Sequence, residues 1–291
     1  MPALLALVAV TAVWGVTFVQ VKDALVLYPL LAFMAVRFAI ASAVLAVPAA
    51  RRVRTLGGDG LGAGLVLGGL LAAGYGLQTA GLERTTVSST GFITGLYVVF
   101  TPLLALALFR SRIPPAAWGG ALLAVVGLAF LSGVDTGRLD GDLLVLASTL
   151  AQALQIVLVE RFAARYDALA LTFLEMVTCL VVFGGLAAAL GDFSIPHGRT
   201  VWAALLVTGI FASALAYLVQ IWAQRRLSAA RIALVFALES PFAGLFGYLL
   251  DGDRLGALGW TGCVLILAGI ALAEPAAAES LRRFTRRVSE T

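Results

Sequence analysis

Long apolar runs separated by short polar breaks extend along almost the whole chain. A membrane-spanning helix needs ~20 mainly apolar residues. Ten runs of about this length occur: Leu4–Val21, Pro29–Val47, Leu61–Ala80, Thr90–Phe109, Ala116–Val134, Leu143–Val159, Ala168–Leu190, Val201–Ala223, Ile232–Leu250 and Leu255–Ala273. Breaks such as RRVRTLGGDG and LDGDRLG leave no room for a soluble domain, and the alternation of β-barrel strands is absent. The pattern predicts an all-α integral membrane protein with ten transmembrane helices.

The composition agrees with a membrane protein. Hydrophobic residues make up 61% of the 291-residue chain and charged residues only 12%, whereas a soluble domain carries about 25% charged residues. The net charge of +4 is small and scattered, so we expect no nucleic-acid partner. Because no basic stretch precedes the first apolar run, which continues to Val21, we predict an uncleaved first helix and not a signal peptide.

The cysteines and the single histidine form no cluster. Cys179 and Cys263 lie within apolar runs, and His197 lies in a connecting loop. Metal sites and disulfide frameworks need several such residues at set spacings. We therefore expect no metal and no cofactor.

Basic residues are distributed unevenly between the two sets of loops. With ten spans both termini lie on one side, and that side holds fourteen Lys and Arg residues: Arg51, Arg52, Arg54, Arg110, Arg112, Arg161, Arg165, Arg225, Arg226, Arg231, Arg282, Arg283, Arg286 and Arg287. The opposite loops hold five: Lys22, Arg84, Arg138, Arg199 and Arg254. Because cytoplasmic loops carry the excess of basic residues, both termini are predicted to be cytoplasmic.

The sequence contains an internal repeat. WGGALLAVVGLAF begins at Trp118 and WTGCVLILAGIAL at Trp260, and Thr101-Pro102 in the fourth run matches Ser240-Pro241 in the ninth. These matches define two five-helix repeats, residues 1–134 and 140–273, followed by a cytoplasmic tail at 274–291. Since five is odd, the second repeat must cross the membrane inverted. Inverted repeats are a common plan of secondary transporters, with the substrate site near mid-membrane.

Glu239 lies near the middle of the ninth run, in VFALESPFAGLF. A charge at the bilayer centre costs at least ~2.5–3.5 kcal/mol, so such a group usually faces a wet cavity or the bundle interior. Pro241 removes a backbone hydrogen bond there and is predicted to open the helix. Glu239 could bind a substrate ammonium, carry a coupling proton, or be a structural carboxylate bonded to neighbouring helices.

Two further ionisable side chains lie within the runs. Arg37, in the second run, could bind a substrate carboxylate or satisfy carbonyls and glutamates structurally. Glu175 lies closer to the cytoplasmic end of the seventh run, where it could reach the interface or pair with Arg37.

Aromatic and uncharged polar residues also occur at membrane depth, many of them at i,i+3 spacing on one helix face. The candidates for substrate binding are Trp14, Thr17, Tyr75, Gln78, Tyr97, Gln152, Gln155, Tyr217 and Gln220. Any one of them could serve as an interhelical hydrogen-bonding group. The set as a whole favours a cavity for a small polar or zwitterionic molecule.

Together these features resemble the EamA-type members of the drug/metabolite transporter superfamily. The resemblance rests on WGVTF in the first run, Arg37-Phe38, the proline after a polar residue in the fourth and ninth runs, and the glycine-rich fifth and tenth runs. It implies a carrier of the bacterial inner membrane, often an exporter of amino acids and related metabolites, with a central cavity lined by both repeats. The matching positions are Trp14, Arg37, Pro102, Glu239 and Pro241.

We therefore expect a secondary transporter of small metabolites, such as amino acids or aromatic and amphipathic solutes, working by alternating access. It would be proton-coupled or facilitative, lie in the lipid bilayer, and act as a monomer or homodimer. The alternatives are an intramembrane enzyme and a channel-like pore. An enzyme would need paired Asp, Ser/His or HExxH residues within the runs, and these are missing from the sequence.

Overall fold

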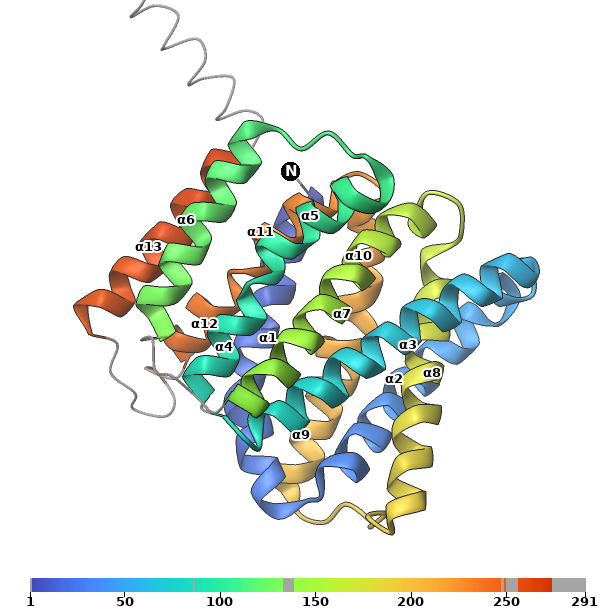
Figure 1. The fold of residues 1–291 in the computed structure, drawn as a ribbon. Coiled ribbons are helices and arrows are strands. Elements are labelled where there is room, and N and C mark those ends of the chain that lie inside the picture. The colour runs from blue at the N-terminus through green and yellow to red at the C-terminus, as the bar shows by residue number, and fades with distance from the viewer. Residues whose placement is uncertain (1, 86, 133–138, 247–248, 250–255, 274–291) are drawn as a thin grey trace, which may run out of the picture.

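The computed structural model describes residues 2–85, 87–132, 139–246, 249 and 256–273, and the described residues contain helices and no strand. The first half holds α1 (Pro2–Leu27), α2 (Leu30–Val53), α3 (Gly57–Leu82), α4 (Val87–Gly95), α5 (Tyr97–Phe109) and α6 (Pro115–Ser132). The second half holds α7 (Leu139–Ala163), α8 (Ala168–Leu190), α9 (Arg199–Gly209), the π-helix η1 (Ile210–Leu215), α10 (Ala216–Gln224), α11 (Ala229–Phe236), α12 (Glu239–Phe246) and α13 (Ala257–Ala273). Figure 1 shows them as one bundle.

The helices match most of the predicted spans. Among the described residues, 7 helical segments are long and apolar enough to cross a membrane, and they fall on the second, third, fourth and sixth to ninth predicted runs. The first, fifth and tenth runs contain the shorter apolar helices Pro2–Thr17, Pro115–Leu131 and Ala257–Ala273. The all-α membrane fold is therefore confirmed, and the count of ten spans stays a prediction.

Large apolar side chains cover the outside of the bundle. Leu122 in α6, Val181 in α8 and Val264 in α13 are each more than 60% exposed, although they lie well inside their helices. Extended exposed apolar surface is rare on soluble monomers. On a bundle of apolar helices it is the surface that faces lipid.

Two predicted spans are interrupted, each on the N-terminal side of a proline. Leu96 separates α4 from α5, which contains Pro102. Ala237 and Leu238 separate α11 from α12, where Pro241 lies in the first turn. A proline cannot donate its backbone hydrogen bond, and its ring presses on the carbonyl four residues earlier. The helix is therefore weakened just before Pro102 and Pro241, and the second interruption makes Glu239 the first residue of a new helix.

Helices from the two halves pack against one another throughout the bundle. α6 lies along α13 at one edge (Figure 1), and α2 lies along α8. α3 packs on α7 and α8, while α9 and α10 pack on α1, and α9 also packs on α2. One core cluster joins α1, α5, α7 and α11, and another joins α2, α3, α8 and α10. The hydrophobic core is thus built between the halves.

Four glycines bring α6 and α13 into backbone contact. A methyl group on Gly120 would lie 2.5 Å from the carbonyl oxygen of Gly269, and one on Gly269 would lie 2.5 Å from that of Gly120. Gly127 and Gly262 form a second reciprocal pair, with corresponding distances of 2.6 and 2.4 Å. The later glycine of α6, Gly127, contacts the earlier glycine of α13, Gly262, so the two helices run antiparallel. Only glycine allows backbones to approach this closely.

Candidate substrate site

Arg37 is the centre of a polar cluster between the two halves. Its side chain is only 6% exposed. The Nε atom donates to Ser213 Oγ at 2.7 Å, and Nη2 donates to the Tyr75 hydroxyl at 3.2 Å. The Tyr75 and Tyr217 hydroxyls lie 3.1 Å apart. Arg37 is therefore held by uncharged groups from α3 and η1, and within the described part of the chain it forms no salt bridge with a glutamate.

Aromatic rings enclose this cluster. The Arg37 guanidinium carbon lies 5.1 Å from the centre of the Tyr75 ring and 5.6 Å from that of Phe38. Trp14 is 5.8 Å from Tyr217 between ring centres, and it meets Phe236 edge to face at 4.9 Å. The contacts of the Arg37 guanidinium with the Tyr75 and Phe38 rings stabilise the cation in a site with little water. The rings of Trp14, Tyr217 and Phe236 form an apolar wall beside the charge.

The π-helix η1 connects Trp14 to this cluster. A π-helix changes the backbone hydrogen-bond pattern, and such turns often occur at functional sites. Here the indole Nε1 of Trp14 donates to the carbonyl oxygen of Ala212 at 2.8 Å. The next residue, Ser213, accepts from Arg37. One turn of η1 therefore positions both the tryptophan of α1 and the arginine of α2.

A second polar cluster surrounds Glu175. This residue is fully buried, and Gln155 Nε2 donates to its Oε1 at 2.8 Å. Gln220 Nε2 donates to Gln155 Oε1 at 3.0 Å and to Gln224 Oε1 at 3.1 Å. Gln224 in turn donates to the carbonyl oxygen of Ile156 at 2.6 Å. Glu175 Oε2 and Gln220 Oε1 are buried and find no hydrogen-bond partner among the residues that the structure describes.

This geometry answers two of the questions that the sequence left open for Glu175. The side chain does not reach the interface, since its exposed fraction is 0%. It also makes no salt bridge with Arg37 in this structure; its partner is the amide of Gln155. α8 points Glu175 towards α7, whereas Arg37 of α2 points towards α3 and η1.

Glu239 and Tyr97 lie beside the interruptions of the fourth and ninth spans. Glu239 is half-buried at the start of α12, and it lies within electrostatic range of Arg37 and of Tyr97. Tyr97 begins α5 and is 5% exposed. Glu239 therefore places a carboxyl group near the positive charge of Arg37 without contacting it.

The other predicted site residues form interhelical or local bonds. Gln78 donates to Thr94 Oγ1 at 3.0 Å, and Gln152 donates to Ser148 Oγ at 3.0 Å. Thr17 donates back to the carbonyl oxygen of Trp14 at 2.8 Å. Gln78, Gln152 and the rings of Trp14 and Tyr75 are half-buried, so they form the more open side of the region.

Three contributors to the site were not found from the sequence. Ser213 is one serine in the apolar segment IFASAL, and its role depends on the π-helix η1. Phe236 looks like an ordinary core residue until its contact with Trp14 is seen. Gln224 did carry a signal, because it lies four residues after Gln220 on one helix face. In the part of the chain that the structure describes, no group of three or more metal-binding side chains occurs.

The glutamine cluster leads to a stability prediction. Gln155→Leu removes the donor of Glu175 and the acceptor of Gln220, so a buried carboxyl group loses the one hydrogen bond that the described residues give it. Leaving such a group unsatisfied costs ~1–3 kcal/mol or more. We expect a clearly lower midpoint of thermal unfolding in detergent. Gln78→Leu, which removes one half-buried bond to Thr94, is the matched control with the smaller loss; equal losses would contradict this account.

Comparison with known proteins agrees with this picture. The sequence matches the EamA-like transporter family over residues 1–133 and again over 139–273. An uncharacterized transporter of Archaeoglobus fulgidus is 31% identical over 91% of this chain and 83% of its own length. The uncharacterized transporter YcxC of Bacillus subtilis is 24% identical over 92% and 91%.

A solved structure described only as the crystal structure of a protein has the same fold. It superimposes with a TM-score of 0.81 over 96% of this chain and 98% of its own, at 20% sequence identity. The family match covers nearly every residue of both halves. The chain therefore belongs to the EamA-like transporter family and is a multi-pass membrane transporter.

Proposed function

We propose that the protein is a secondary transporter that moves a small zwitterionic metabolite, such as an amino acid, by alternating access between two inverted halves. The observation that carries the proposal is the buried guanidinium of Arg37. Among the described residues its hydrogen-bond partners are the neutral groups of Ser213 and Tyr75, and Glu239 lies within electrostatic range. A buried charge without a charged partner is costly in a membrane and marks a functional site.

The two charges fit the two ends of an amino acid. In this proposal Arg37 receives the substrate carboxylate, because its fork of donors matches a carboxylate. Glu239 receives the ammonium group or a coupling proton. Trp14 and Tyr217 provide an aromatic surface for an apolar side chain. Neutral Ser213 and Tyr75 hold the guanidinium without cancelling its charge.

The packing of α6 and α13 supports an inverted repeat. The Trp-x-Gly alignment equates Gly120 with Gly262 and Gly127 with Gly269. Exchanging the halves therefore converts the Gly120–Gly269 contact into the Gly262–Gly127 contact. A contact that maps onto itself in this way is typical of a two-fold relation.

Other observations support the same relation. The touching hydroxyls of Tyr75 and Tyr217 are 142 residues apart, and the two tryptophans of the repeat have the same separation, because 260 − 118 = 142. The packing of α3 on α7 has its counterpart in the packing of α9 and α10 on α1. The family also matches each half separately.

Alternating access requires the site to open to either side. In this structure Arg37 and Tyr217 are only 6% and 7% exposed, so the site is closed around them. The contacts that close it join α3 to α10 and α1 to η1, which belong to opposite halves. Rocking one half against the other would break these contacts. The excess of basic residues on one side supports cytoplasmic termini, and the family resemblance supports export across a bacterial inner membrane.

Reconstitution into proteoliposomes tests the proposal. We expect saturable uptake of at least one member of a broad amino-acid panel, accelerated when the same solute is present on the far side. Glu239→Gln should alter transport or its dependence on pH if Glu239 binds the ammonium group or a proton. An absence of saturable flux across the panel would contradict the carrier. Unchanged transport and pH dependence in Glu239→Gln would remove the role of Glu239 and leave the fold intact.

A further inference from the structure

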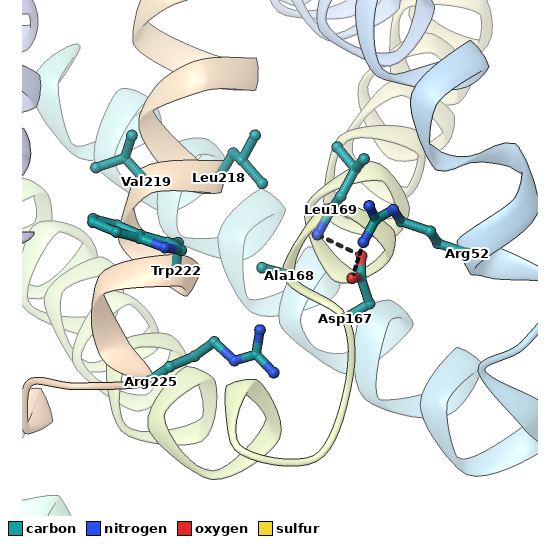
Figure 2. A pocket seen from close by; sticks show the side chains of 8 residues that line it. All are labelled: Arg52, Asp167, Ala168, Leu169, Leu218, Val219, Trp222 and Arg225. Carbon is teal, nitrogen blue, oxygen red and sulfur yellow. Dashed lines mark hydrogen bonds and ion pairs between the residues drawn. The ribbon is translucent and has the colours of Figure 1, made fainter.

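A pocket of about 370 Å³ lies away from the central site, between α2, α8 and α10. Leu218, Val219 and Trp222 of α10 and Leu169 of α8 form its apolar wall. Figure 2 shows charged side chains at its edge: Arg52 enters from α2 and Arg225 from the end of α10, on opposite sides of the first turn of α8.

The pocket lies at one end of the bundle, where α2 and α10 end and α8 begins. Arg52 is in the last turn of α2, and Arg225 is the C-terminal cap of α10. Asp167 is the N-terminal cap of α8. Trp222 lies one turn before Arg225, at the level where tryptophan is enriched in membrane proteins. The apolar wall thus lies on the bilayer side of the charged edge.

The edge of the pocket is positively charged. Asp167 is already engaged, since its Oδ1 accepts from the backbone nitrogens of Leu169 and Ala170, and its Oδ2 pairs with Arg52 Nη1 at 2.5 Å. Within the described residues, the Arg225 side chain has no hydrogen bond or ion pair. The Arg226 guanidinium carbon lies 4.9 Å from the centre of the Trp222 ring. An anion would therefore be attracted here, because the acidic residue among the described lining residues, Asp167, is already paired.

We propose that this pocket binds an anionic phospholipid. Its phosphate would lie between Arg52 and Arg225, and the part of an acyl chain nearest the headgroup would lie against Trp222 and Leu218. A phospholipid combines the negative charge that the edge attracts with the apolar surface that the wall covers. Basic pockets between transmembrane helices bind anionic headgroups in this way. The inference does not depend on which solute is transported. Since the pocket connects α2 to α8 and α10, the lipid would hold helices of both halves together.

Native mass spectrometry of the full-length protein in detergent tests the proposal. The probes are dioleoyl-phosphatidylglycerol, dioleoyl-phosphatidylcholine and sodium phosphate, each added alone. We expect the wild type to bind phosphatidylglycerol about tenfold more tightly than phosphatidylcholine, and Arg52→Gln/Arg225→Gln to lose about tenfold in affinity for phosphatidylglycerol. Arg51→Gln/Arg165→Gln is the matched control, because it removes two exposed arginines near the same helix ends outside the pocket. It should bind like the wild type.

Quenching of Trp222 fluorescence locates the lipid. Phosphatidylglycerol with brominated acyl chains should quench the wild type more than Trp222→Phe, and both proteins should elute as one peak in size exclusion. Equal phosphatidylglycerol binding by wild type and Arg52→Gln/Arg225→Gln would overturn the proposal. So would equal affinity for phosphatidylcholine. Binding of phosphate from sodium phosphate as tight as that of phosphatidylglycerol would assign the pocket to a free anion and overturn the lipid proposal.

Discussion

Gly262→Ala should lower the midpoint of thermal unfolding in detergent by several degrees, and Gly262→Leu should prevent accumulation of folded protein. A methyl group at this position would lie 2.4 Å from the carbonyl oxygen of Gly127 and 2.8 Å from the backbone nitrogen of Leu131. Backbone atoms cannot rotate away as side chains do, so α13 would have to move off α6. Overpacking of this kind costs ~1–3 kcal/mol for a small group, which corresponds to roughly 2–10 °C in a protein of this size.

The matched control is Gly185 in α8. It is a helical glycine with nothing within 4 Å of its methyl position. Gly185→Ala should not lower stability, because alanine favours the helix over glycine by about 1 kcal/mol. Gly185→Leu should still yield folded protein. If Gly262→Ala were as stable as Gly185→Ala, the backbone contact between α6 and α13 would not exist as described.

Arg37→Gln should abolish most transport while leaving a folded protein. Glutamine keeps a donor for Ser213 or Tyr75 but removes the positive charge that the proposal assigns to the substrate carboxylate. A hydrogen bond to a charged group contributes ~1.5–3 kcal/mol, so the ratio of maximal rate to half-saturating concentration should fall by at least roughly tenfold to a hundredfold. The measurement is initial uptake into proteoliposomes at several substrate concentrations.

Two further variants separate the charge from its positioning. Arg37→Lys keeps the charge without the planar fork, so we expect partial activity. Ser213→Ala keeps the guanidinium but removes its Nε partner, so the loss should be smaller than in Arg37→Gln. A stable Arg37→Gln protein that transports at the wild-type rate would show that Arg37 is structural.

The membrane fold could be read from the sequence because the bilayer imposes a length and an apolar character on each helix. The run at Ala168–Leu190 coincides with α8, since Asp167 caps its start and Gly191 adopts a left-handed conformation at its end. Other helices extend beyond their apolar runs into exposed polar segments, which hydropathy does not mark. α3 begins at Gly57, whereas its apolar run begins at Leu61.

The candidate site was predictable in its residue types but not in its grouping. Spacing along single helices paired Tyr75 with Gln78 and Tyr217 with Gln220. In the structure Tyr75 meets Tyr217, and each glutamine bonds elsewhere. Contacts between helices depend on how the two halves pack against each other. The π-helix η1, which brings Ser213 to Arg37, was not predicted from the apolar segment IFASAL.

Accessibility of one position from both sides of the membrane tests the alternating-access account most directly. Ser213→Cys, in a background with Cys179→Ala and Cys263→Ala, would report on the hydroxyl that holds Arg37. We predict slow labelling by a membrane-impermeant maleimide in both right-side-out and inside-out vesicles, with substrate changing the two rates in opposite directions. Labelling from one side alone, or from neither, would contradict two inverted halves that open one buried site to each side in turn.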